Sequence, residues 1–81
     1  MPPTASLAST IERTDREIAE AEQLIHEGVQ SIIVALRKGG DTIESEKDVA
    51  QMRAALELLH AQRRKLVRGM YDAQRSSATA A

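Results

Sequence analysis

The sequence predicts an all-α protein in which two long helices fold back on each other as an antiparallel coiled-coil hairpin. Three observations lead to this fold class. Ile11, Ile18, Ile25 and Ile32 recur every seven residues, which is the spacing of a coiled-coil seam. No proline occurs after the first three residues, so nothing in the body of the chain forbids helix. One strong break, Gly39-Gly40, divides the chain into two helical segments.

The first helix is expected to cover about residues 9–38. Ser9-Thr10-Ile11-Glu12 has the spacing of a capping box, in which the hydroxyl and the carboxylate each satisfy a free backbone amide. Residues 1–8, which hold both prolines and several small residues, are expected to form a flexible N-terminal arm. Thr14, Ala21, Gly28 and Ala35 follow the seam isoleucines at a spacing of three and complete the stripe.

The second helix is expected to cover about residues 42–75, after a turn at 39–41 and before a flexible tail at 76–81. Asp41-Thr42-Ile43-Glu44 repeats the capping signal, and Gly39 or Gly40 can take the left-handed conformation that ends the first helix. The same heptad pattern continues here, interrupted by Arg63. Its apolar members are Val49, Met52, Leu56, Leu59, Leu66, Met70 and Ala73.

With the turn centred near residue 42, residues whose numbers add up to roughly 82–86 should lie level in the hairpin. Arg63, Arg64 and Arg68 would then face the acidic stretch 12–22. The basic run 63–65 is therefore interpreted as neutralised within the chain, in preference to an RNA-binding patch. Arg63 at a seam position either reaches Glu20 or Glu22, or sets the register or the oligomeric state, and the sequence leaves both readings open.

Composition excludes several classes of protein. The net charge of −1 argues against general nucleic-acid binding, and the absence of cysteine rules out disulfides and thiol chemistry. No apolar stretch is long enough to span a bilayer, and the first ten residues do not resemble a secretory signal, so a cytoplasmic location is expected. No phosphate-binding loop or nucleophile motif is present, so we expect neither an enzyme nor a cofactor.

A hairpin of two helices buries one seam only, and a chain of 81 residues without disulfides usually needs an oligomer or a partner to complete its core. Apolar residues outside the seam indicate where that partner would bind. They are Leu24, Ile33, Val34 and Leu58. Because they gather towards the turn, we expect a partner surface there, with either a second copy, giving a four-helix bundle, or a different helical protein as the partner.

Two Glu/His pairs offer a less favoured alternative, a metal-binding dimer. Glu22 and His26 lie one turn apart in the first helix, and Glu57 and His60 have the Glu-x-x-His spacing of di-iron helical bundles. The heptad positions place all four on one flank of the hairpin. Solvated flank residues with ordinary ion pairs are the preferred interpretation.

The stretch Leu36-Arg37-Lys38-Gly39-Gly40-Asp41 joins two long helices through a basic residue and a Gly-Gly turn. In this respect the chain resembles the small helical-hairpin E-component co-chaperones of type III secretion needle subunits. The resemblance covers about residues 7–71. It implies a cytoplasmic hairpin that binds a helical-repeat chaperone and helps to keep a needle subunit soluble. The expected function is therefore a non-enzymatic adaptor or co-chaperone, with a homo-oligomeric structural bundle as the alternative.

Overall fold

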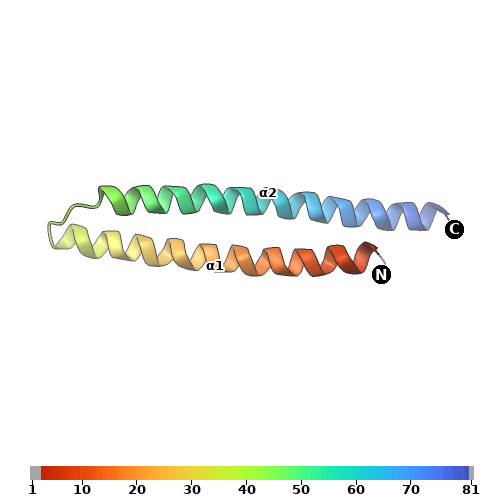
Figure 1. Cartoon of the computed structure of the whole chain (residues 1–81), viewed down its shortest axis with the longest axis horizontal. Coiled ribbons are helices and arrows are strands. Elements are labelled where there is room, and N and C mark those ends of the chain that lie inside the picture. Colours follow the sequence, from red (N-terminus) through yellow and green to blue (C-terminus); the bar gives the residue numbers. More distant parts are fainter. Residues whose placement is uncertain (1–2, 81) are drawn as a thin grey trace.

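A computed structural model describes residues 3–80 of the chain, with side chains for residues 6–76. It contains two α-helices, α1 (Pro3–Arg37) and α2 (Ile43–Ala80). They run antiparallel and side by side, so that both ends of the chain lie at the same end of the molecule (Figure 1). The predicted all-α helical hairpin is confirmed.

Both helices are longer than the sequence predicts. Residues 3–8, expected as an arm, form the first turns of α1, and residues 76–80, expected as a tail, continue α2. Pro3 is tolerated as the first helical residue because the amide it lacks would have no helical partner there. Ser9 and Thr10 consequently lie inside the helix, where the Thr10 hydroxyl donates to the Ser6 carbonyl at 3.0 Å instead of capping. Residues 1, 2 and 81 lie outside the described residues.

The turn lies where the two glycines predict it. Gly39 adopts φ +73°, its amide donates to the Leu36 carbonyl at 3.1 Å, and the Gly40 amide donates to the Ala35 carbonyl at 2.8 Å. This pair of hydrogen bonds is the Schellman motif, which satisfies carbonyls at the end of a helix. At the start of α2 the Asp41 carboxylate accepts a hydrogen bond from the Ile43 amide at 3.0 Å, so Asp41 caps the helix through an Asx turn and not through the spacing of three that a capping box requires.

The seam between the helices follows the predicted heptads. Thr14, Ile18 and Val49 are buried, with 2%, 7% and 5% of their surface exposed. The other seam positions from Ile11 to Ala35 and from Met52 to Ala73 are half-buried, and these include Arg63. A single seam of half-buried side chains is what two helices alone can provide, because each helix covers one stripe of the other.

The register differs from the predicted one. Gly28 faces Val49, Asp15 binds Arg63 and Leu7 approaches Gly69, so the numbers of facing residues add up to between 76 and 78, not 82 to 86. Gly28 leaves room for Val49, because a Cβ atom at Gly28 would lie only 2.8 Å from Cγ2 of Val49. The turn is thus centred on the two glycines and not on residue 42.

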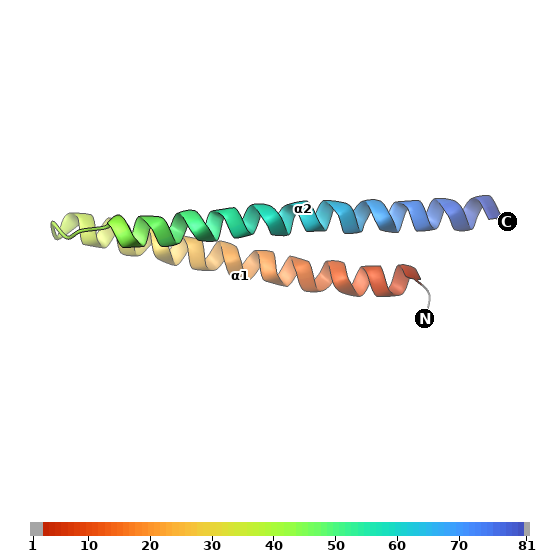
Figure 2. The same cartoon turned by 45° about the horizontal axis from the view of Figure 1, so that its top comes forward.

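The molecule is a rod of 66 × 15 × 14 Å. α2 extends beyond the first turn of α1, and this overhang is visible in both views (Figures 1 and 2). In Figure 2 the helices overlap near the turn and separate towards their free ends, so they cross at a shallow angle. Candidate binding surfaces therefore lie on the sides of the rod and not in an enclosed core.

Candidate interaction surfaces

Among the side chains of residues 6–76, seven that are large and apolar are exposed. All four residues that the sequence nominates as partner contacts belong to this set, and Leu58 is the most exposed of them, at 73%. The full set is Leu24, Ile33, Val34, Leu36, Ile43, Leu58 and Tyr71. Sequence reasoning missed Leu36, Ile43 and Tyr71, although Leu36 directly follows a seam position and Tyr71 is the chain's only aromatic residue.

The four nominated residues do not share one face. Leu24 directly precedes the seam residue Ile25, whereas Ile33 directly follows the seam residue Ile32. Nine residues at 100° each separate Leu24 from Ile33 by half a turn, which places them on opposite sides of α1. Val34 directly precedes the seam residue Ala35, so it lies on the Leu24 side of α1, turned further away from α2.

Because α2 runs antiparallel to α1, residues that follow seam positions on both helices meet on the same side of the hairpin. We call this side the groove flank; it carries Ile33 and Leu36 on α1 and Ala50, Arg53 and Tyr71 on α2. The side formed by residues that precede seam positions is the opposite flank, and it carries Leu24 and Leu58. Exposed apolar side chains therefore occur on both flanks of the seam.

Near the turn, the groove flank contains an apolar groove of about 290 Å³ between the helices. Its floor is apolar, and Glu46 and Arg53 are its charged members. The apolar lining consists of Val29, Ile32, Val49 and Ala50. The exposed Ile33 immediately follows Ile32, so apolar surface continues from this groove to the outside of α1.

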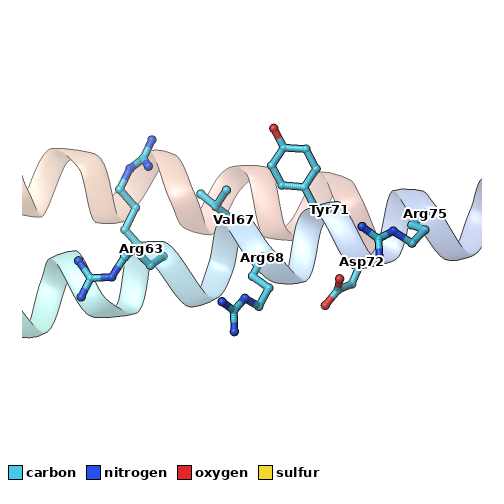
Figure 3. Close-up of a pocket in the computed structure, with 7 residues that line it drawn as sticks. Arg63, Val67, Arg68, Tyr71, Asp72 and Arg75 are labelled. Atoms are coloured by element: carbon cyan, nitrogen blue, oxygen red, sulfur yellow. The ribbon is translucent and has the colours of Figure 1, made fainter.

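A second and larger groove, of about 520 Å³, lies towards the free ends of the helices. It is lined by Arg63, Arg64, Val67, Arg68, Tyr71, Asp72 and Arg75, all from α2 (Figure 3). The lining of the second groove repeats that of the first 18 positions later, which is five helical turns. The corresponding pairs are 46 and 64, 49 and 67, 50 and 68, and 53 and 71. Both grooves therefore lie on the same flank of α2, about 27 Å apart.

The basic run 63–65 is neutralised only in part. Arg63 Nε donates a hydrogen bond to Asp15 Oδ1 at 2.6 Å. Asp15 belongs to the acidic stretch 12–22 that was predicted to face the basic run, but it is neither of the two expected partners, Glu20 and Glu22. Among side chains in the described range 6–76, no ion pair joins Arg64, Lys65 or Arg68 to α1. The expectation that the run 63–65 is neutralised therefore holds for Arg63 and fails for Arg64 and Lys65.

The Glu/His pairs do not form a metal site within one chain. Across the part of the chain that the structure describes, no three His, Asp or Glu side chains come close enough to hold a metal ion. The shifted register accounts for part of this result. In the predicted register Glu22 would lie level with His60 and His26 with Glu57, because their numbers add up to 82 and 83. In the observed register, facing residues add up to 76–78, so the members of these pairs are offset by about five residues.

No protein family model, no curated protein and no solved structure matches this chain. Within residues 3–80, neither helix contains a stretch apolar enough and long enough to cross a bilayer.

Proposed function

We propose that this chain is a non-enzymatic protein-interaction module that packs a helical partner against its exposed apolar side chains in the half of the hairpin near the turn. One observation carries the proposal. Ile18 and Val49 are the buried apolar residues among the described side chains, whereas seven large apolar side chains are exposed. Apolar surface left in water at this density is typical of a binding surface.

The position of the exposed residues supports a helix as the partner. Val29 lines the apolar groove, and Ile33 and Leu36 follow it at spacings of four and three along the groove flank of α1. A third helix laid along this groove would bury them in the way that helix-in-groove complexes do. On the opposite flank, Leu24 and Leu58 offer a second, smaller contact, so a two-helix partner could enclose the hairpin from both sides.

More specifically, we propose that the chain is an adaptor or co-chaperone that acts in the cytoplasm. An adaptor needs no catalytic group, and a hairpin that completes its own core on a partner would also cover apolar surface on that partner. The alternative is a structural bundle made from copies of this chain, in which the same side chains would be buried against each other. A metal-binding dimer has no comparable support, because its four candidate residues do not converge within one hairpin.

Aspartate substitutions on the apolar surface test the proposal. Ile33→Asp and Val34→Asp should each abolish association, because a carboxylate buried in an apolar interface without a partner is strongly destabilising. Gln30→Asp, at an exposed polar position of the same helix, is the matched control and should leave association intact. Association is measured as the mass in solution by light scattering and as capture of a partner by affinity-tagged protein.

The two readouts separate the alternatives. A defined dimer or tetramer that Ile33→Asp converts to monomer would identify the structural bundle. A monomer that captures a helical protein, and loses it on substitution, would identify the adaptor. If both aspartate variants associate as the unsubstituted chain does, the apolar surface is not the binding surface and the proposal fails.

A further inference from the structure

The basic groove near the free ends of the helices has no role in the proposed function. It lies on the C-terminal half of α2, about five turns from the apolar groove, and its residues span 63–75, about 18 Å of helix. Figure 3 shows its side chains projecting from α2, with Tyr71 and Arg68 on different sides of the opening. A groove of about 520 Å³ on a single helix is large enough to receive side chains from another molecule.

Its charge is only partly balanced within the chain. Asp15 neutralises Arg63, and Asp72 is the single acid of the lining. Arg64 and Arg68 lie one turn apart, are exposed, and form no ion pair with any side chain in the described range. These two arginines therefore present a pair of cations from positions whose Cβ atoms lie about 6 Å apart, the spacing of residues four apart on a helix.

The groove also has an apolar component. Val67 lies between the two arginines in sequence, and Tyr71, at 67% exposed, is the only aromatic side chain of the protein. An aromatic ring beside arginines can pack against apolar groups while the guanidinium groups bind carboxylates. The ligand that fits is consequently both acidic and amphipathic.

We infer that this groove binds an acidic amphipathic helical segment of another protein, with carboxylates four residues apart on Arg64 and Arg68 and an apolar side chain over Val67 and Tyr71. Carboxylates at this spacing on a helix match the spacing of the two arginines. Arginine can bind a carboxylate through two parallel hydrogen bonds. This geometry fixes the orientation of the contact in addition to the attraction between the charges.

The surroundings of the groove favour a short acidic helix over an extended polyanion. Glu12 and Asp15 follow seam positions on α1 at the level of the groove, and the chain as a whole carries a net charge of −1. A nucleic acid or an anionic membrane is wider than the groove, so it would also cover α1 at this level and meet these carboxylates. A helix confined to the groove would avoid most of that repulsion.

A peptide-binding experiment tests the inference. The probe is a fluorescein-labelled amphipathic peptide of about twelve residues, the length of the groove, with Glu at spacings of three and four and Leu on the intervening face. We expect saturable binding in fluorescence anisotropy that weakens as salt is raised. Arg64→Glu combined with Arg68→Glu should weaken it roughly 10-fold or more, since each reversal replaces an attraction with a repulsion. Tyr71→Ala should weaken it several-fold without changing the salt dependence.

Matched controls make the result specific. Arg53→Glu reverses an arginine on the same flank but outside the groove, and it should leave the affinity within about twofold. A peptide with Gln in place of Glu should not bind. Helix content measured by circular dichroism should be the same for all variants, because the substituted side chains are exposed.

Several outcomes would overturn the inference: no saturable binding, binding that survives the double reversal, or tighter binding to a single-stranded oligonucleotide or to vesicles containing phosphatidylserine. These outcomes leave the proposed function untouched, because Ile33 and Val34 lie in the half of the hairpin near the turn. Conversely, loss of partner binding in Ile33→Asp with normal peptide binding would show that the two surfaces act independently.

Discussion

Gly28 packs directly against Val49 of the facing helix, and a Cβ atom at Gly28 would lie 2.8 Å from Cγ2 of Val49. Valine is stiff about χ1, so it cannot turn its methyl group away without strain. Gly28→Ala should therefore lower the free energy of unfolding by about 1 kcal/mol, although alanine in place of glycine normally stabilises a helix. Urea unfolding followed by circular dichroism measures the change.

The control is the same substitution in a Val49→Ala background. With the methyl groups of Val49 removed, Gly28→Ala should raise the free energy of unfolding by about 0.5–1 kcal/mol, which is the ordinary helix-propensity gain. If Gly28→Ala stabilises the protein to the same extent in both backgrounds, Gly28 does not determine the spacing of the helices.

Gly39 is the second glycine with a strict requirement, because its φ of +73° lies in the left-handed region. Gly39→Ala should cost about 1–2 kcal/mol of unfolding free energy, and Gly39→Asn less, since asparagine tolerates this conformation better. Gly40→Ala is the neighbouring control. Its backbone is not left-handed and its Cβ would lie 3.4 Å from the Ala35 carbonyl oxygen, so the cost should be clearly smaller. Equal costs at both positions would contradict the assigned turn.

Arg63 occupies a seam position but binds Asp15 with both side chains nearly half exposed. An ion pair this open to water contributes about 0.2–1 kcal/mol, and salt weakens it. Arg63→Leu should therefore raise the free energy of unfolding by about 1 kcal/mol, because leucine continues the apolar seam. Thermal melts at low and high salt measure this. A loss of more than about 2 kcal/mol would mean that the pair is far stronger than its exposure indicates.

Thr14 is the most buried side chain described, and its hydroxyl donates to the Thr10 carbonyl at 2.9 Å. That carbonyl is also an acceptor within the helix, so removing the hydroxyl leaves no buried polar group without a partner. Thr14→Val should raise the free energy of unfolding by about 0.5–1 kcal/mol. Thr10→Val, whose hydroxyl is less buried, should have a smaller effect, and a reversed order of the two variants would contradict this explanation.

The sequence was sufficient to predict the hairpin, the turn and the seam. Period-seven spacing identified Ile18 and Val49 as core residues because only one stripe of each helix can face the other. Gly39 was identifiable because a helix that must end sharply favours glycine in the left-handed region. Asp41 was identifiable because its carboxylate can accept from a free amide at a helix start.

The register was not predictable in the same way. A heptad pattern repeats along both helices, so sliding one helix past the other leaves many apolar contacts intact. Val49 packs against Gly28 because glycine has no side chain, and this contact selects one of these alignments. Such a contact depends on interatomic distances, which the spacing of residues in the sequence does not give. Pairing of Arg63 with Glu20 or Glu22, one of the two readings that the sequence left open, is wrong for this reason, since the shifted register brings Asp15 to Arg63 instead.

The helix ends and the exposed surfaces show two other limits. Ser9 and Thr10 fit a capping box, but the same hydroxyls can bond to carbonyls inside a helix, so the motif did not locate the start of α1. The nominated partner residues were correctly placed outside the seam. Predicting which flank each residue occupies also requires its angular position around the helix. That angle differs by half a turn between Leu24 and Ile33.

Gly28 with Val49 and Asp15 with Arg63 lie at successively greater sequence distances on either side of the Gly39-Gly40 turn. Each pair that forms shortens the loop that the next pair must close, so the chain entropy lost at each step is small. The interhelical contacts can therefore form one after another, starting at the turn and ending at the termini. Amide protection against hydrogen exchange should fall along both helices in the same direction, and the last turns to close are those beside the basic groove.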